Sequence, residues 1–416
     1  MKVYLKTFGC RANQYDSETV RAMVERSGGA IVAQPEDADI AVFNSCAVTA
    51  EAEVDLRKSI RRAARRQPEL TTLVMGCAAA LDRGVLSSLP TVRHVVPGAD
   101  FTALAEALEL PAAALGAAAT QAGTRALLRI QDGCDEHCTF CATTVARGAH
   151  RSRHPDVLVE EATRLAARHA EIVLTGIHIG SYGSEIASSL GALVERLVSD
   201  VPAVRFRLSS IEATEIDARL RALFGAAGRV TPHVHAPLQS GSDRVLKRMG
   251  RHWYTASRYA QAMETLIAPR AVFGFGADVI AGFPGETDED HRATVALVSS
   301  LPFTYLHVFP YSVRPGTAAE RLPGRLPGDV IEARARELRA LGERKATTYA
   351  ASRSGGMADV VVVRGDARQG LTEDYLTVTI DGAAAGRGQR LTMRLDLVDG
   401  RLVARPSGES PAQRPV

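Results

Sequence analysis

Three cysteines within eight residues, Cys134, Cys138 and Cys141, constrain this chain more than any other feature of its sequence. They directly follow an apolar run at residues 126–130 that has the character of a buried strand. Three thiolates on one tight loop can hold three irons of an iron–sulfur cube and leave the fourth iron open. A catalytic metal site requires such an open position, because a substrate or cofactor can then coordinate there.

The same three thiolates could instead hold a structural zinc ion, with a histidine as the fourth ligand. His137 lies inside the loop, and His150 and His154 form an H-x3-H pair shortly after it. Arg151 and Arg153 flank that pair, and their charges would repel a divalent cation. The sequence therefore favours an iron–sulfur cluster and leaves zinc as the alternative.

The remaining cysteines, Cys10, Cys46 and Cys77, stand well apart in the first hundred residues. Six cysteines in 416 residues are sparse for a secreted protein held together by disulfides. If each set of three binds a cluster, no cysteine is left over, and such clusters suit a reducing compartment. The first apolar stretch contains charges and is followed by no cleavage site. We therefore expect a cytoplasmic protein without a signal peptide or a membrane span.

Residues 1–110 are expected to form an open parallel sheet with helices on its faces, because strand-like and helix-like segments alternate there. Strands are predicted at residues 3–8, 40–44, 73–75 and 92–96. Cys10, Cys46 and Cys77 each lie just past the carboxyl end of one of the first three strands. Because ligands bind at that edge of open parallel sheets, the pattern favours a second cluster over three buried structural cysteines.

Residues 125–352 repeat the alternation and are expected to form a barrel of parallel strands. Strands are predicted at residues 126–130, 171–176, 204–208, 233–237, 272–280 and 305–309. Six strand–helix units indicate a partial (β/α)6 barrel, open on one side to admit a large substrate. A complete barrel of eight units is the alternative, but the strand count does not reach eight.

The ends of barrel strands commonly carry the chemistry of such folds. Candidate cofactor-binding residues at these ends are Gly176, Ser209, Gln239, Gly282 and Phe309, together with Phe140 in the cysteine loop. For Gly176, the close packing of a turn is an equally good explanation, and Phe309 could be a core residue. The glycines of residues 280–286 would let the backbone approach a ligand closely.

The net charge of +3 permits an RNA partner without requiring one. Arg147, Arg151 and Arg153 form a basic group just after the cysteine loop, and we expect them to contact phosphates of the substrate.

Residues 111–124 are rich in alanine and poorly periodic, so they are expected to be a linker. After Gly355 and Gly356 the pattern changes to short strands, predicted at residues 358–363, 376–380, 389–395 and 401–404. Residues 355–405 are therefore expected to form a small antiparallel β-barrel. Such a barrel either binds RNA or only stabilises the protein. The tail at residues 406–416 is expected to be disordered.

The spacing of the three clustered cysteines, with Phe140 before the last, resembles the signature of radical S-adenosylmethionine enzymes. Residues 9–13 (GCRAN), 44–49 (NSCAVT) and 76–79 (GCAA) resemble the three cysteine motifs of the methylthiotransferase family. Residues 280–286 are similar to the segment that lies along the adenosine of the cofactor. Residues 370–378 resemble a TRAM domain, the RNA-binding barrel of many tRNA-modifying enzymes.

This resemblance implies two 4Fe-4S clusters and S-adenosyl-L-methionine as cofactors. One S-adenosylmethionine would be cleaved at the cluster of Cys134, Cys138 and Cys141, giving a radical that takes hydrogen from an adenine carbon. Sulfur from the other cluster, held by Cys10, Cys46 and Cys77, would be inserted at that carbon. A second S-adenosylmethionine would supply the methyl group. All six cysteines would then be both metal ligands and catalytic residues.

Residues 174–183 and 233–251 look most like the family branch that acts on N6-threonylcarbamoyladenosine next to the tRNA anticodon. The expected partners of a monomeric enzyme are the anticodon stem-loop of tRNA and an electron donor such as flavodoxin or ferredoxin. The alternatives within the family are isopentenyladenosine in tRNA and an aspartate of a ribosomal protein. An alternative from another class is a non-catalytic iron–sulfur protein that binds RNA.

Overall fold

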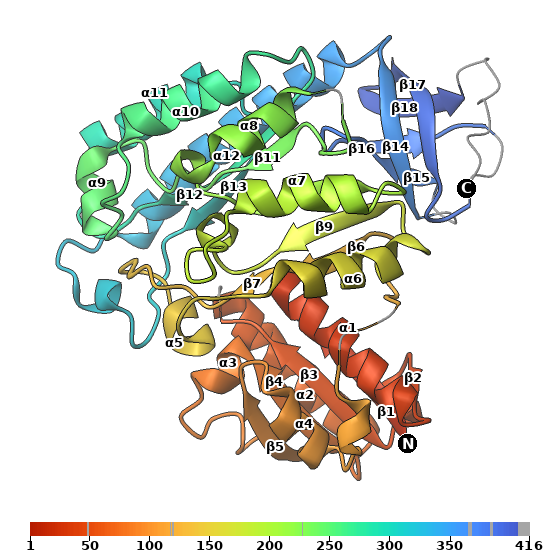
Figure 1. Ribbon diagram of the computed structural model, residues 1–416. Helices are drawn as coiled ribbons and strands as arrows, with labels where there is room; N and C mark the ends of the chain where they lie inside the picture. The colour runs from red at the N-terminus through yellow and green to blue at the C-terminus, as the bar shows by residue number, and fades with distance from the viewer. Residues whose placement is uncertain are drawn as a thin grey trace.

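A computed structural model describes residues 1–47, 50–116, 118, 120–226, 228–364, 368–382 and 386–406. An N-terminal α/β unit, a central barrel of parallel strands and a small C-terminal β-barrel follow one another along the chain (Figure 1). The predicted mixed α/β class is thus confirmed. Apart from Pro406, which ends a strand, the predicted disordered tail lies outside the described residues. None of the described helices is long and apolar enough to cross a membrane.

The N-terminal unit is a parallel sheet whose strand order, among the described residues, is β2-β1-β3-β4-β5. Its strands are β1 (Lys2–Thr7), β2 (Ala30–Val32), β3 (Ile40–Ser45), β4 (Thr71–Gly76) and β5 (Val92–Pro97). Its helices are α1 (Arg11–Arg26), α2 (Ala50–Arg66), α3 (Cys77–Ala80) and α4 (Phe101–Ala107), with a 3-10 turn at Pro35–Asp37. The sheet has an apolar core on each face, one with Met23 of α1 and one with Leu56 of α2. The short edge strand β2 was missed by the sequence prediction, because three residues carry too little periodicity.

The central barrel contains, within the described residues, six parallel strands, as predicted. They are β6 (Ala126–Arg129), β9 (Glu171–Thr175), β10 (Arg205–Leu208), β11 (His233–His235), β12 (Gly274–Ala281) and β13 (Tyr305–Pro310). The sheets β10-β9-β6 and β11-β12-β13 are joined by a parallel bridge between Ser210 and His235. A two-stranded antiparallel ribbon, β7 (Gln131–Asp132) with β8 (Arg151–Ser152), flanks the cysteine loop.

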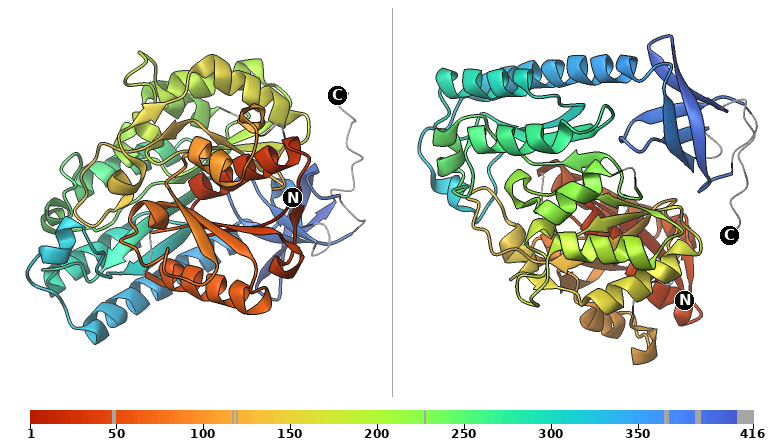
Figure 2. Two further views of the ribbon diagram at one scale, coloured as in Figure 1. Left: turned by 90° about the horizontal axis from the view of Figure 1, so that it is seen from below. Right: turned by 45° about the horizontal axis from the view of Figure 1, so that its top comes forward.

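Helices cover the outer side of these strands (Figures 1 and 2). They are α6 (Pro155–Ala166), α7 (Leu190–Asp200), α8 (Ala218–Gly225), α9 (Asp243–Arg248), α10 (Ala256–Ile267), α11 (Asp288–Ser300) and α12 (Gly328–Ser352). The short helix α5 (Thr143–Arg147) follows the cysteine loop and packs against α3 of the N-terminal unit. Short 3-10 turns occur at Ala112–Ala114, Ile179–Ser181, Ala213–Glu215 and Ala318–Arg321.

The two faces of the barrel strands differ sharply in polarity. Residues such as Phe206, Val234 and Ala277 face outward into the apolar core shared with the helices. Because side chains alternate along a strand, their neighbours face inward. The inward set is polar over much of the barrel and includes Glu171, Arg205, Arg207, His233, His235, Asp278, Tyr305 and His307.

Helix α1 covers the inner face of the first barrel strands. Tyr15 packs against Leu127 and Val173, and Asp16 forms ion pairs with Arg129 and Arg147. Figure 1 shows α1 running directly below β6. The N-terminal unit therefore closes one side of the barrel interior and brings its own cysteines toward it.

The C-terminal residues form a closed barrel in the order β14-β15-β16-β18-β17. Its strands are β14 (Met357–Arg364), β15 (Gln369–Leu371), β16 (Thr377–Ile380), β17 (Arg390–Val398) and β18 (Arg401–Pro406). The predicted barrel is confirmed, with two corrections. Strand β15 was missed because it is only three residues long, and β16 pairs with β18 in parallel, so the barrel is not wholly antiparallel.

Residues 371–375, here called the docking loop, attach the C-terminal barrel to the central one. Arg207 donates to the carbonyl oxygens of Thr372 and Glu373 at 2.9 and 3.0 Å, and Arg205 donates to that of Leu371 at 3.3 Å. The ring of Tyr375 stacks on His233, with centroids 4.4 Å apart. The docking loop, which is part of the TRAM-like run, therefore lies in the interface between the two barrels. Its carbonyl groups at residues 371–373 accept hydrogen bonds from the buried Arg205 and Arg207.

The expected linker at residues 111–124 is partly packed where it is described. Ala114 and Ala118 are buried. The Gln121 side chain pairs with the backbone of Leu127 in both directions, at 2.7 and 2.8 Å. These contacts fix the path of the chain from the N-terminal unit into β6.

Candidate functional site

Cys10, Cys46 and Cys77 lie at one edge of the N-terminal sheet, in the turns after β1, β3 and β4. The Sγ atoms of Cys10 and Cys77 each lie 3.9 Å from the side-chain oxygen of Asn13. Cys46 packs against Gly9, where an added Cβ would lie 2.4 Å from its Sγ. Gly9 adopts a φ of +91°, so glycine is required there both for the turn and for this close approach.

Asn13 holds the three turns together. It lies in the first turn of α1, and its amide nitrogen donates to the carbonyl oxygens of Phe8 and Ser45 at 2.9 and 2.8 Å. Its backbone oxygen accepts a bond of 2.7 Å from the Asn44 side chain. Sequence reasoning quoted Asn13 only as part of a motif, because its central place follows from contacts with residues 31 and 32 positions away.

Arg147 links this site to the central barrel. Its guanidinium donates to Cys77 Sγ at 3.4 Å, to Asn13 Oδ1 at 2.6 Å and to Asp16 Oδ2 at 2.7 Å. Burial raises the pKa of the Cys77 thiol to about 11, although the Arg147 charge acts in the opposite direction. A bound cluster, whose thiolates carry negative charge, would find its counter-charge in Arg147.

The expected contact of the basic group with substrate phosphates is corrected for two of its members. Arg147 is only 5% exposed and engages the groups just described. Arg153 donates to Glu161 and Tyr15 at 2.6 and 3.2 Å. Both guanidinium groups are therefore paired with groups of the protein itself, whereas Arg151 is exposed.

Cys134, Cys138 and Cys141 lie on a loop that packs against the mouth of the central barrel. The loop is fixed by backbone bonds from Cys134 to Gly148 at 3.1 Å and from Thr139 to Met249 at 2.8 Å. Two backbone N–H groups point at sulfur, one of them from Glu136 to Cys134 Sγ at 3.4 Å. Such donors stabilise thiolate charge, as a metal–sulfur cluster requires.

Two charged pairs at the strand ends contact this loop. His178, after β9, places Nδ1 3.8 Å from Cys134 Sγ while Nε2 lies 2.8 Å from Glu215. Burial disfavours protonation of His178, but its bonds to Cys134 and Glu215 outweigh burial and raise its pKa to about 10. Arg251 lies 3.6 Å from Cys138 Sγ and pairs with Glu212. Sequence reasoning missed Arg251, because it lies in a loop 113 positions from Cys138.

In each cysteine set, at least two sulfurs lie farther apart than a single zinc ion would hold them. Tetrahedral zinc at about 2.3 Å from each sulfur would hold its ligand atoms about 3.8 Å apart. Neither cysteine set forms a group whose ligand atoms all lie within 4.8 Å, as far as the described residues go. Two of the three histidines of the zinc alternative have other partners: His150 bonds Glu185 at 2.8 Å, and His154 caps α6.

The predicted cofactor-binding residues lie around the same mouth. Ser209 follows β10, and its buried hydroxyl has no partner among the described residues, as a position awaiting a ligand would show. Gln239 adopts a φ of +63°, a strained backbone for this residue type that often marks functional sites. Phe309 lies on the inner face of β13 opposite Ile280.

The remaining predicted residues have clear packing roles. At Gly176 an added Cβ would lie 2.8 Å from Gln131, whose side chain accepts bonds from the backbone of Ile177 and His178. At Gly282 an added Cβ would lie 2.6 Å from Ile331 of α12. Phe140 packs edge-on against Phe283, with centroids 6.4 Å apart. These three residues position the cysteine loop and the turn after β12.

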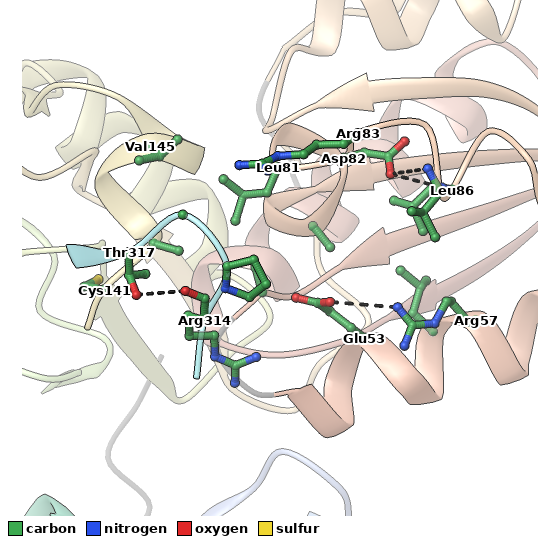
Figure 3. Close-up of a pocket in the computed structure, with 17 residues that line it drawn as sticks. Glu53, Arg57, Leu81, Asp82, Arg83, Leu86, Cys141, Val145, Arg314 and Thr317 are labelled. Carbon is green, nitrogen blue, oxygen red and sulfur yellow. Dashed lines mark hydrogen bonds and ion pairs between the residues drawn. The ribbon is translucent and has the colours of Figure 1, made fainter. Parts of the chain in front are cut away.

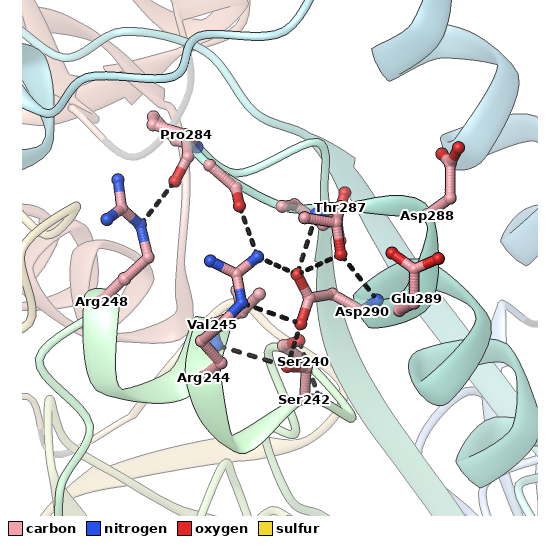
Figure 4. A network of polar contacts seen from close by, with 12 residues as sticks. Ser240, Ser242, Arg244, Val245, Arg248, Pro284, Thr287, Asp288, Glu289 and Asp290 are labelled. Carbon is pink, nitrogen blue, oxygen red and sulfur yellow. Dashed lines mark hydrogen bonds and ion pairs between the residues drawn. The ribbon is translucent and has the colours of Figure 1, made fainter.

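A polar network holds the turns after β11 and β12 against each other (Figure 4). Asp290, in the first turn of α11, accepts from Ser242 at 2.6 Å, pairs with Arg244 and forms a capping box with Thr287. Arg248 donates to the carbonyl oxygen of Pro284 at 2.9 Å. This network fixes the loops that carry Gln239 and Gly282 relative to the cysteine loop.

A pocket of about 320 Å³ lies between the two cysteine sets (Figure 3). Its wall includes Cys141 on one side and Ala47 and Ala78, the neighbours of Cys46 and Cys77, on the other. The side chains of Glu53 and Arg314 also line it. The pocket therefore reaches Cys141 of one set and residues adjacent to the buried Cys46 and Cys77 of the other.

In comparisons with known proteins, the N-terminal unit and the central barrel match two different families. Residues 2–98 match the uncharacterized protein family UPF0004, and residues 128–298 match the radical SAM superfamily. The threonylcarbamoyladenosine tRNA methylthiotransferase MtaB of Aquifex aeolicus is 31% identical over 401 residues, covering 92% of this chain and 97% of the relative. The protein of the same name from Bacillus subtilis is 33% identical, covering 91% of this chain and 90% of the relative.

Two further similarities are informative. The tRNA-2-methylthio-N(6)-dimethylallyladenosine synthase of Erythrobacter litoralis is 31% identical and covers 86% of each chain. Among solved structures, the radical S-adenosylmethionine methyltransferase TsrM from Kitasatospora setae aligns with a TM-score of 0.57 at 15% identity, covering 77% of this chain and 75% of TsrM. At that identity the likeness shows a shared fold alone.

Proposed function

Because the chain belongs to the radical S-adenosylmethionine methylthiotransferase family, we propose that it modifies tRNA at N6-threonylcarbamoyladenosine next to the anticodon. It would insert sulfur and a methyl group at C2 of that base. The names of the Aquifex aeolicus and Bacillus subtilis relatives support this substrate. The observation that carries the proposal is the pocket lined by Cys141 and by the neighbours of Cys46 and Cys77, because the reaction needs two clusters beside one carbon.

Hydrogen-bond donors beside Cys134 and Cys77 support the proposal that each cysteine set binds a 4Fe-4S cluster. Cys134, Cys138 and Cys141 would hold one cluster, and Cys10, Cys46 and Cys77 the other. When bound, the first cluster with S-adenosylmethionine supplies hydrogen abstraction and the second supplies sulfur. Asn13 and Arg147 then position the second set, while His178 and Arg251 position the first.

The partners follow from the same reaction. We propose that the enzyme works as a monomer on the anticodon stem-loop and takes electrons from a small redox protein such as flavodoxin or ferredoxin. The C-terminal barrel would contact RNA through surfaces other than the docking loop, because that loop is occupied by Arg205 and Arg207.

The test compares one cysteine from each set. Cys46→Ala should retain reductive cleavage of S-adenosylmethionine but form no methylthio product on tRNA that carries threonylcarbamoyladenosine. Cys138→Ala should lose both activities, because its cluster is incomplete. Nucleoside mass spectrometry and 5′-deoxyadenosine release are the two readouts.

The opposite outcome is equally clear. A soluble Cys46→Ala protein that methylthiolates tRNA at the wild-type rate would refute the two-cluster proposal. Wild-type protein that carries both clusters but releases no 5′-deoxyadenosine would instead support a non-catalytic RNA-binding protein.

A further inference from the structure

A cluster of three polar side chains lies on the inner face of the central barrel, apart from both cysteine sets. Asp278 of β12 stands between His235 of β11 and His307 of β13, and one carboxylate oxygen serves both imidazoles. His235 Nε2 lies 3.1 Å and His307 Nδ1 3.2 Å from Asp278 Oδ1. We call these three residues the lumen cluster.

The hydroxyl group of Tyr305 holds the lumen cluster in place. The Tyr305 hydroxyl lies 3.1 Å from His235 Nδ1 and 2.9 Å from His233 Nε2. The His233 ring in turn stacks on Tyr375 of the docking loop. Burial would raise the pKa of Asp278, but the bonds from His235 and His307 outweigh burial and hold that pKa below its usual range. The cluster therefore presents a fixed carboxylate flanked by imidazoles.

Its depth in the barrel suits the far end of a modified base. Asp278 lies three residues before Ala281 at the end of β12, and His307 lies three residues before Pro310 at the end of β13. These strands rise about 3.3 Å per residue. The cluster therefore lies about 10 Å from the strand ends that face the cysteine loop. A base held with its C2 near those ends would direct its N6 substituent along the barrel toward the cluster.

Two atoms of the cluster remain open for a ligand. Asp278 Oδ2 and His307 Nε2 have no hydrogen-bond partner within the part of the chain that the structure describes. The His307 side chain is 55% exposed. His307 donates its Nδ1–H to Asp278 Oδ1, so its Nε2 accepts. Two acceptors side by side complement two neighbouring N–H groups, as in a urea.

We propose that the lumen cluster recognises the ureido group in the N6 substituent of the substrate base. The inference rests on the proposed function and names the residues that select its substrate. Asp278 Oδ2 and His307 Nε2 each accept from one of the two ureido N–H groups. A dimethylallyl substituent leaves only the N–H on N6 and lacks the second N–H, so one of these acceptors would stay unpaired, which disfavours it.

The test uses His307, the exposed member of the cluster, in two replacements. The ratio of kcat/KM on threonylcarbamoyladenosine tRNA to that on dimethylallyladenosine tRNA is measured for each variant. His307→Phe should lower this ratio about tenfold or more, because it removes a hydrogen bond made only with the first substrate. His307→Gln, whose amide oxygen can still accept, should restore much of it. His94→Phe, at an exposed histidine on β5, is the matched control and should leave the ratio unchanged.

Each result bears on the inference. A lowered ratio in His307→Phe with recovery in His307→Gln supports it. An unchanged ratio, or an equal loss on both substrates, overturns the lumen cluster assignment while the proposed function stands. If the wild-type protein modifies only dimethylallyladenosine tRNA, both the proposed function and this assignment fail.

Discussion

Arg207 provides the sharpest test of how the C-terminal barrel is attached. This side chain is fully buried and makes four hydrogen bonds: two to Glu171, at 2.8 and 3.1 Å, and two to docking-loop carbonyl oxygens, at 2.9 and 3.0 Å. Arg207→Leu would remove all four and leave those carbonyl groups without their charged donor. Removing one partner of a buried ion pair costs about 3–5 kcal/mol.

The lower end of that range applies here. Glu171 keeps Arg205 at 2.7 Å and Arg125 at 3.2 Å, so its charge stays compensated. We expect a loss of about 3 kcal/mol, and at 1.36 kcal/mol per factor of ten this is about a hundredfold rise in opening of the docking loop. Because a chain of several domains has no single unfolding free energy, the opening should be measured locally. Amide hydrogen exchange of residues 371–376, which include the Tyr375 amide bonded to Thr372 at 3.2 Å, reports it directly.

The control variant is Arg219→Leu. Arg219 pairs with Glu195 at 3.4 Å, but both side chains are exposed, so this pair contributes about 0–1 kcal/mol. Docking-loop exchange in Arg219→Leu should match the wild type. If exchange in Arg207→Leu stays within about threefold of the wild type, the buried arginine does not hold the barrel in place.

Two further substitutions test the cysteine sites. Gly133→Ala should prevent the Cys134 loop from forming, because Gly133 has a φ of +74° and an added Cβ would lie 1.9 Å from the Ala149 carbonyl oxygen. The iron content after reconstitution should then fall by about half. The control Gly225→Ala, with open space around the added Cβ, should load iron fully. Asn13→Leu should abolish formation of the methylthio product while S-adenosylmethionine cleavage continues. It removes the amide that bonds both Phe8 and Ser45 at the second cysteine set. Product formation at the wild-type rate in a folded Asn13→Leu protein would contradict this role.

Much of the architecture was determined by the sequence itself. The six barrel strands, the helices between them and the barrel after Gly355 were predicted because periodicity and turn residues are local signals. The cysteine loop was recognisable for the same reason, since its spacing is a property of eight consecutive residues. The lone cysteines were placed at strand ends by their immediate neighbours alone.

The tertiary structure decided what surrounds these features. Nothing near Arg147 in the chain indicates that it bonds Cys77 and Asn13, 70 and 134 positions away. The docking loop resembles an RNA-binding run, yet Arg205 and Arg207 occupy its carbonyl groups across more than 160 residues. The pattern of polar and apolar residues predicts which side chains share a face of one helix or strand. The packing of separate units decides which of these faces meet. Buried charged groups at such contacts then bond to the distant groups that the packing brings within hydrogen-bond reach.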